Sequence, residues 1–334
     1  MQECDFLVIG AGSWGTALAI LLARNSHQVW LWGHDAAHTK ELQQQRCNQR
    51  YLPEQSFPES LQAIDDLEAA LKCAKHVLIV VPSGAFAEVV ARIAPQLPEA
   101  TGICWATKGL EQRTQQLLHQ VAQQHFGKNK PMAVISGPTF AGEVAADLPT
   151  AMTIAADQLE YAESLAAYLR NAHCRVYTST DMIGVQLGAA AKNVIAIAAG
   201  IADGMKLGAN TRAALITRGL TEIMRLGVAL GGQRETFMGL AGLGDLVLTC
   251  TDNQSRNRRF GYALAQGEGI QQAQQDIAQV VEGAHAAKQI VTLAQQHHIE
   301  MPISEQVNLV LQGQCTAQQA VHNLLSRDPK PEIE

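Results

Sequence analysis

Residues 6–15 read FLVIGAGSWG, and this stretch decides the fold. Four apolar residues, typical of a buried strand, run directly into glycines at positions 10, 12 and 15. Between a strand and a helix, the first glycine permits a tight bend, the second lets the backbone approach a pyrophosphate, and the third lets the helix pack on the strand. The stretch therefore predicts a dinucleotide-binding turn. Its predicted binding residues are Gly10, Gly12 and Gly15, with the backbone of Ser13 and Trp14 facing the phosphates.

The sequence after this turn predicts a sheet. Short runs rich in Val and Ile alternate with segments of helical spacing as far as about residue 180. Such alternation predicts a mostly parallel sheet with helices on both faces, which is a Rossmann-type α/β domain. The expected strands are 6–10, 28–32, 77–81, 102–106, 133–136, 151–155 and 174–177. The expected helices include 14–25, 85–93 and 114–125.

The composition and the hydrophobic pattern of the sequence change after about residue 180. Few strand-like runs remain, and Ala, Gln and Leu dominate segments that are typical of helices. We therefore expect a dinucleotide-binding domain over 1–180 and an all-α domain over 181–334, with Thr180 or Asp181 as the cap of the first helix. The apolar run 185–201 contains Lys192 and is short for a membrane span, so we interpret it as a buried, alanine-rich helix.

The composition is that of a globular protein with sizeable cores. Of 334 residues, 47% are apolar and 17% are charged. The formal charge of −6 gives no general attraction to nucleic acid or anionic membranes, so neither is expected as a partner. Seven scattered cysteines without close pairs favour free thiols in a reducing cytosol over a disulfide framework or a zinc site. We expect a cytoplasmic protein without a metal.

The end of the second expected strand concerns the choice of cofactor. Asp35 lies at the distance after Gly15 expected of an acid that accepts from a ribose 2′-hydroxyl, which would favour NAD. The same residue could instead cap the next helix. Basic residues close in sequence could offer charge to the 2′-phosphate of NADP; these are His34, Lys40, Arg46 and Arg50. The sequence leaves both cofactors open.

Two lysines are candidates for chemistry. Lys192 lies among small and apolar residues over 188–200, so it either extends to solvent or is presented into a cleft. In a cleft, desolvation would lower its pKa towards a range useful for proton transfer. Lys108 follows an expected strand and so should lie at the sheet edge where ligands bind, although loop lysines are also common on protein surfaces.

Residues 239–260 resemble an anion-binding site beside an acid. A glycine-rich turn delivers Asp245 into an apolar setting, where a carboxylate needs a partner such as a lysine ammonium; a helix cap is the alternative. Ser255, Arg256 and Asn257 combine a possible helix cap, a forked cation and an amide, which suits phosphate. Arg258 and the following arginine are expected to be solvated or paired locally. With the dinucleotide turn, this indicates a redox enzyme for a small phosphorylated substrate.

These motifs together resemble those of the bacterial-type NAD(P)-dependent sn-glycerol-3-phosphate dehydrogenases. The similar stretches are 10–15, 106–109, 136–143, 191–193, 239–261 and 281–283. The resemblance implies a Rossmann domain followed by a helical domain, usually in a homodimer. It also implies reversible reduction of dihydroxyacetone phosphate to sn-glycerol 3-phosphate with NADP or NAD, supplying glycerophospholipid synthesis.

The resemblance also implies roles for individual residues. Lys192 would accept the proton in the oxidative direction, and Lys108 would contact both substrate and cofactor. Further substrate contacts would come from Gly137, Thr139, Asp245, Ser255, Arg256 and Asn257. Further cofactor contacts would come from Ser13, Trp14, His34, Ala141, Arg256, Val280 and Glu282.

Two other functions are compatible with the motifs. One is a different two-domain dehydrogenase, acting on a hydroxy acid similar to 3-hydroxyisobutyrate, which would prefer a carboxylate substrate over a phosphate. The other is a sensor that binds the dinucleotide without catalysis. A sensor would not need the candidate lysines, the acid and the anion-binding residues, so these favour an enzyme. A measurement of turnover distinguishes an enzyme from a sensor.

Overall fold

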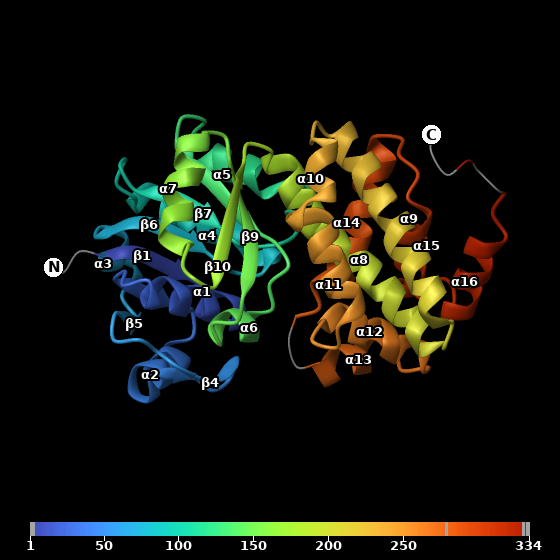
Figure 1. Ribbon diagram of the computed structural model, residues 1–334, viewed down its shortest axis with the longest axis horizontal. Coiled ribbons are helices and arrows are strands. Elements are labelled where there is room, and N and C mark those ends of the chain that lie inside the picture. Colours follow the sequence, from blue (N-terminus) through green and yellow to red (C-terminus); the bar gives the residue numbers. More distant parts are fainter. Residues whose placement is uncertain (1–3, 278–279, 329–330, 332–334) are drawn as a thin grey trace. The chain divides into compact units, whose positions relative to one another are not determined.

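The structure, a computed structural model, describes residues 4–277, 280–328 and 331. The chain forms two compact units (Figure 1). The first combines Met1–Ala189 with Gly232–Asp245, and the second combines Ala190–Gly231 with Leu246–Glu334. The simple division at residue 180 stays a prediction.

An eight-stranded sheet forms the centre of the first unit. Neighbouring strands are parallel, except that β8 and β9 are antiparallel. The predicted mostly parallel sheet is therefore confirmed. In sheet order its strands are β10 (Cys174–Ser179), β9 (Thr150–Ala156), β8 (Met132–Ser136), β7 (Gly102–Trp105), β6 (Ala74–Ile79), β1 (Cys4–Ile9), β2 (Val29–Trp32) and β5 (Leu61–Ile64).

All seven expected strands are present, with ends that differ by a few residues. Three short strands were not expected: β5 at the sheet edge, and β3 (Cys47–Asn48) and β4 (Leu52–Ser56), which pair with each other. Their two to five residues are too few to display a period. They form because β2 and the neighbouring backbone offer pairing partners.

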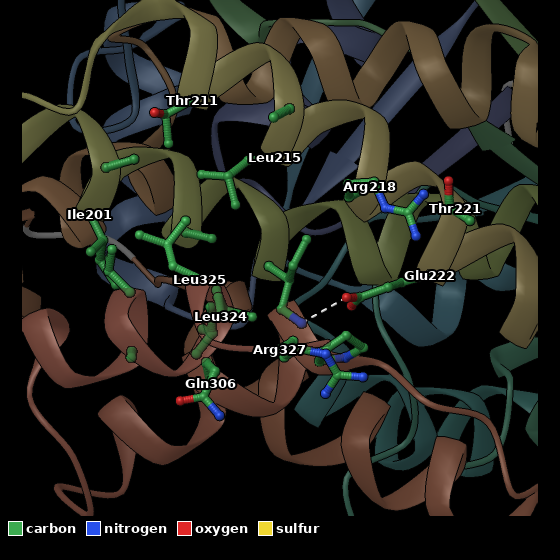
Figure 2. A pocket seen from close by; sticks show the side chains of 18 of the residues that line it. Ile201, Thr211, Leu215, Arg218, Thr221, Glu222, Gln306, Leu324, Leu325 and Arg327 are labelled. Carbon is green, nitrogen blue, oxygen red and sulfur yellow. Dashed lines mark hydrogen bonds between the residues drawn. The ribbon is translucent and has the colours of Figure 1, made fainter. Parts of the chain in front are cut away.

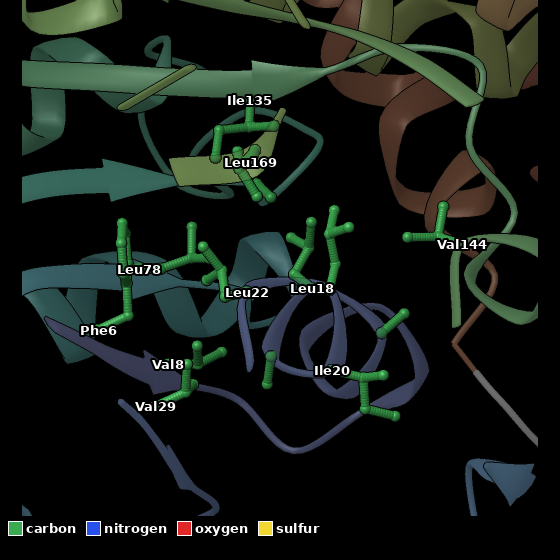
Figure 3. Packing of buried hydrophobic residues seen from close by; sticks show 14 of the residues in the cluster. Phe6, Val8, Leu18, Ile20, Leu22, Val29, Leu78, Ile135, Val144 and Leu169 are labelled. Carbon is green, nitrogen blue, oxygen red and sulfur yellow. The ribbon is translucent and has the colours of Figure 1, made fainter. Parts of the chain in front are cut away.

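Helices cover both faces of the sheet, as predicted (Figure 1). Alternate residues of β1 enter different cores: Phe6 and Val8 pack with Leu18 and Leu22 of α1 (Figure 3), whereas Ile9 packs on the other face with α4 and α5. The helices of this unit are α1 (Ser13–Arg24), α2 (Ala36–Gln45), α3 (Leu67–Leu71), α4 (Ser83–Ile93), η1 (Ala94–Gln96), α5 (Leu118–Phe126), α6 (Ala141–Ala145), α7 (Leu159–Leu169), α10 (Arg234–Met238) and η2 (Leu240–Gly244).

The helix expected over 114–125 starts later than predicted, at Leu118. The Glu111 carboxylate accepts hydrogen bonds from the backbone N–H groups of Arg113 and Thr114. Leu110 also forms a β-bridge with Leu117. These local bonds satisfy the backbone in a turn, so the helix cannot extend through it.

The second unit is helical. Its helices are α8 (Met182–Gly204), α9 (Gly208–Ala229), α11 (Asp245–Thr251), α12 (Arg256–Ala265), α13 (Ile270–Ile277), α14 (Glu282–Gln296), α15 (Pro302–Leu311) and α16 (Ala317–Leu325), where the first residues of α8 and α11 belong to the first unit. The Asp181 carboxylate accepts from the Gly184 N–H at 2.8 Å, which confirms Asp181 as a cap of α8. By length and composition α8 could cross a membrane, but 94% of its apolar window is buried in the protein, as expected of a core helix.

Helices α8 and α12 pack backbone against backbone. A Cβ on Gly200 would lie 2.0 Å from the Arg258 carbonyl oxygen, and one on Gly261 would lie 2.1 Å from the Ile197 carbonyl oxygen. The Arg258 guanidinium also donates two hydrogen bonds to Asp203 Oδ2, at 2.9 and 2.6 Å. Local pairing of Arg258 is thus confirmed, and the contact fixes the start of α12 against α8.

Candidate active site

The turn after β1 has the backbone that a dinucleotide site requires. A Cβ on Gly10 (φ 122°) would lie 2.2 Å from the Val80 carbonyl oxygen, and one on Gly15 would lie 1.9 Å from the Gly10 carbonyl oxygen. Gly12, by contrast, faces open space. Helix α1 starts at Ser13 without a side-chain cap, so its first N–H groups suit a pyrophosphate. The close backbone contacts at Gly10 and Gly15 agree with the tight turn and the helix packing predicted for them, whereas the approach of Gly12 to a pyrophosphate stays a prediction.

The segment around β3 is fastened to this turn. The buried Asn48 amide donates to the Ala11 carbonyl oxygen at 3.0 Å and to Thr16 Oγ1 at 2.8 Å. The Ser13 hydroxyl donates to the Tyr51 carbonyl oxygen at 2.7 Å. Asn48 and Tyr51, which lie before and after Arg50 in the sequence, are thus hydrogen-bonded to the dinucleotide turn.

Asp35 caps α2, which confirms that interpretation of this acid. Its carboxylate accepts from the N–H groups of His38 at 3.2 Å and Ala37 at 3.0 Å. The bond from His38 is the largest contribution that lowers the pKa of Asp35 below its ordinary value, and the charge of Arg50 adds to the lowering. His34 is exposed beside it.

Lys108 and Asp245 form an ion pair in the first unit. Lys108 Nζ lies 2.7 Å from Asp245 Oδ2 and 3.3 Å from the Gly137 carbonyl oxygen. The side chain of Asp245 is 1% exposed and that of Lys108 is 18% exposed. The lysine partner predicted for Asp245 is therefore present. The Thr139 hydroxyl donates to the same Gly137 carbonyl oxygen, at 3.2 Å, and Ala141 begins α6 just beyond.

The glycine-rich stretch before Asp245 is not a simple turn. Residues 240–244 form one turn of π-helix, η2, closed by a hydrogen bond from the Gly244 N–H to the Gly239 carbonyl oxygen at 3.1 Å. A Cβ on Gly242 would lie 2.2 Å from the Phe237 carbonyl oxygen, so glycine permits this wide turn. Such single π-turns are frequent at functional sites, and this one places Asp245 as the first residue of α11.

Lys192 is buried in the second unit. The residue is 6% exposed, so its side chain does not extend to solvent. Nζ donates a hydrogen bond to Thr249 Oγ1 at 2.8 Å. Thr249 was not among the predicted site residues. Its signal in the sequence is its place in α11, one helical turn after Asp245, because residues four apart share a helix face.

Asn257 joins three helices of the second unit. Its amide nitrogen donates to Asn193 Oδ1 of α8 at 2.9 Å, and its oxygen accepts from the Gly283 N–H of α14 at 2.9 Å. A Cβ on Gly283 would lie 2.7 Å from the Asn257 oxygen. Asn193 and Gly283 belong to the stretches 191–193 and 281–283 that resemble the family, but neither residue was assigned a role from the sequence.

Arg256 has the properties of an anion-binding residue. It is the first residue of α12, which Ser255 caps by accepting from the Arg258 N–H at 3.2 Å. Within the described part of the chain, its guanidinium makes no hydrogen bond or ion pair. Burial lowers the pKa of this guanidinium and the charge of Glu282 raises it, but an arginine stays charged at pH 7. A half-buried cation at a helix N-terminus suits a phosphate.

The remaining predicted residues are in the second unit. Val280 is exposed, and Glu282 is the first residue of α14. No group of three or more His, Cys, Asp or Glu is placed to hold a metal ion among the described residues.

A cavity of about 610 Å³ lies elsewhere in the second unit, between α8, α9, α15 and α16 (Figure 2). In its wall, the buried Glu222 carboxylate accepts from the Ile303 N–H at 2.7 Å and from the N–H and hydroxyl of Ser304, and thereby caps α15. None of the predicted site residues lines this cavity.

Comparison with known proteins covers nearly the whole chain. The family models of the N- and C-terminal parts of NAD-dependent glycerol-3-phosphate dehydrogenase match residues 6–162 and 181–322. A glycerol-3-phosphate dehydrogenase (NAD(P)+) of Yersinia pestis (strain Pestoides F) is 56% identical, over 99% of this chain and 98% of that protein.

Solved structures agree with this match. A crystal structure of glycerol-3-phosphate dehydrogenase from Coxiella burnetii has a TM-score of 0.94 and 52% identity, over 97% of this chain and 99% of that one. The enzyme of Saccharomyces cerevisiae, at 22% identity and a TM-score of 0.83 over 98% of this chain and 100% of that one, shares the fold. This chain belongs to the NAD-dependent glycerol-3-phosphate dehydrogenase family.

Proposed function

We propose that this protein is an enzyme that reversibly reduces dihydroxyacetone phosphate to sn-glycerol 3-phosphate with NADPH or NADH, and so supplies glycerophospholipid synthesis. The main structural support for the proposal comes from the second unit. There the Arg256 guanidinium, which has no bonded partner among the described residues, starts a helix that is packed directly on the helix of the buried Lys192. A phosphorylated ketone needs both an anion-binding cation and a proton donor.

The first unit would hold the cofactor through its backbone. The open face of Gly12 and the uncapped start of α1, with Ser13 and Trp14, would receive the pyrophosphate. His34, Ala141, Val280 and Glu282 would add contacts, as the family resemblance implies. When bound, the reduced nicotinamide supplies the hydride that attacks the ketone carbon.

Lys192 would act on the ketone oxygen. Negative charge develops on that oxygen as the carbon is reduced, and a desolvated ammonium that stabilises the charge and then donates a proton lowers the barrier. The bond to Thr249 holds Nζ in one direction and so limits its conformational freedom. In the oxidative direction, neutral Lys192 would accept the hydroxyl proton.

The phosphate would bind at the start of α12, to Arg256 and the backbone near Ser255, with the Asn257 amide beside it. Because the phosphate is remote from the reacting carbon, its binding energy can be used to position the ketone. The proposal also assigns substrate contacts to the first unit, namely Lys108, Gly137, Thr139 and Asp245. There Asp245 holds the Lys108 ammonium in place.

We further propose a cytoplasmic homodimer that is not inserted in a membrane. The family resemblance supports the homodimer and the cytoplasmic location. The burial of α8 inside the protein supports the absence of membrane insertion. Light scattering coupled to size-exclusion chromatography would give twice the chain mass for a dimer and the single chain mass otherwise.

The substrate class is tested by steady-state kinetics with both reduced cofactors. We expect a kcat/KM for dihydroxyacetone phosphate at least about a hundredfold above that for unphosphorylated dihydroxyacetone, because a charge-assisted phosphate site contributes several kcal/mol. Preference for a hydroxy acid with a carboxylate would support the other dehydrogenase class. Nucleotide binding without turnover of any of these substrates would support a sensor.

A further inference from the structure

Arg50, which follows β3, lies against Asp35, just after β2. We propose that Arg50 binds the 2′-phosphate of NADP, so that this chain binds NADPH more tightly than NADH. The proposal deepens the function proposed above, because it rests on the same dinucleotide site.

The position of Arg50 is fixed by its neighbours. Asn48 and Tyr51 are both hydrogen-bonded to the dinucleotide turn, through Ala11, Thr16 and Ser13. The Arg50 guanidinium lies 5.0 Å from the centre of the Tyr51 ring. Its Nη1 is 3.5 Å from Asp35 Oδ2, just after β2. In this fold the adenosine ribose lies between the turn and the end of the second strand, so Arg50 is located where a 2′-phosphate would be.

Asp35 is poorly suited to select NAD. An acid that selects NAD accepts hydrogen bonds from the ribose hydroxyls. Here the carboxylate already accepts two backbone N–H bonds that cap α2, and the Arg50 guanidinium lies against its other oxygen. A ribose would have to compete with the cap, which contributes about 1 kcal/mol to a helix. The charge of Arg50 also offsets the repulsion that Asp35 would exert on a 2′-phosphate.

Arg50 has donors available for this role. Its side chain is 58% exposed, and the contact with Asp35 is its one ion pair within the described part of the chain. A guanidinium offers five N–H donors in a planar fork, which matches the geometry of phosphate. The remaining donors can bind the phosphate while the contact with Asp35 persists.

The other basic residues are less suited. The Arg46 guanidinium donates to the carbonyl oxygens of Phe57, Pro58 and Leu61, so it holds the loop before β5. Lys40 is exposed on α2 and offers a point charge without a fork. His34 is exposed beside Asp35 and is kept as a cofactor contact by the family resemblance. Lys40 therefore serves as a matched control for the loss of one positive charge.

The test measures binding of two nucleotide fragments to the full-length protein by isothermal titration calorimetry. Adenosine 2′,5′-bisphosphate carries the phosphate in question, and 5′-AMP is the same molecule without it. We expect the wild-type protein to bind the bisphosphate about tenfold more tightly than 5′-AMP, and high salt to reduce this preference because Arg50 is exposed. Arg50→Gln should reduce the preference to within about twofold, whereas Lys40→Gln should keep it.

A second variant tests the role given to Asp35. Asp35→Asn keeps a side-chain oxygen that can cap α2 but removes the negative charge, so the preference for the bisphosphate should increase. Equal wild-type affinities for the two fragments, or a preference that survives in Arg50→Gln, would overturn the proposal while leaving the dinucleotide site intact. Failure of the folded protein to bind either fragment would overturn the dinucleotide site itself.

Discussion

Replacement of Lys192 by methionine should abolish most turnover with little effect on folding. Methionine has a similar length, so it fills the space of a side chain that is 6% exposed. The change removes the hydrogen bond to Thr249, which costs about 1 kcal/mol, but it also removes a buried charge, which offsets part of that cost. We expect the net change in unfolding free energy to stay at about 1–2 kcal/mol, which is small beside the effect on turnover and is measured by thermal unfolding.

The catalytic effect of Lys192→Met should be much larger. A positioned proton donor contributes about 10²–10⁴-fold to a rate, so kcat for dihydroxyacetone phosphate should fall by that factor. The assay combines steady-state kinetics, thermal unfolding and nucleotide titration, with the exposed Lys206→Met as the control for loss of a lysine. Turnover within about tenfold of the wild-type value in a variant with intact nucleotide binding would refute the assignment.

Three further predictions concern other parts of the molecule. Arg256→Leu should raise KM for dihydroxyacetone phosphate by at least about tenfold and change the slow turnover of unphosphorylated dihydroxyacetone far less, because only the phosphate loses its charged partner; equal damage with both ketones would count against the phosphate site. Burial lowers the pKa of His76 from 6.5 to about 4. As pH falls, the unfolded chain therefore binds a proton at this histidine before the folded protein does, so stability should fall as pH drops from 6.5 towards 4. His76→Phe should flatten this part of the Tm profile, and an equally steep profile in the variant would contradict the lowered pKa. Gly200→Ala should lower Tm because its Cβ would meet the Arg258 backbone at 2.0 Å, whereas Gly142→Ala, which faces open space in α6, should leave Tm unchanged or raise it.

The fold could be predicted where sequence periods are long and apolar. The run that becomes β1 and the glycines after it specify a strand, a turn and a helix by local stereochemistry alone. β5 could not be predicted, because its four residues include the polar Gln62 and its pairing depends on β2, about thirty residues away. The late start of α5 was missed because side-chain bonds from Glu111 compete with the helix.

The candidate site could be predicted where burial of a charged side chain is energetically unfavourable without a partner. An acid in an apolar setting requires a partner, which led from Asp245 to a lysine, and the structure identifies Lys108, 137 residues away. The contact between Asn193 and Asn257 could not be derived in this way, since neutral amides have many possible partners and a sequence period does not say which helix faces meet. The close approach of α8 and α12 at Gly200 could not be predicted from the sequence either, because a glycine within a helix has several explanations.

The most direct test of the proposed activity is to identify the product and its ratio to the cofactor consumed. The purified protein is incubated with dihydroxyacetone phosphate and NADPH or NADH, and sn-glycerol 3-phosphate is quantified with a stereospecific assay while reduced cofactor is followed by absorbance. We expect one sn-glycerol 3-phosphate for each reduced cofactor oxidised. Cofactor oxidation without this product, or no oxidation by a folded protein that binds the nucleotide, would contradict the proposed activity.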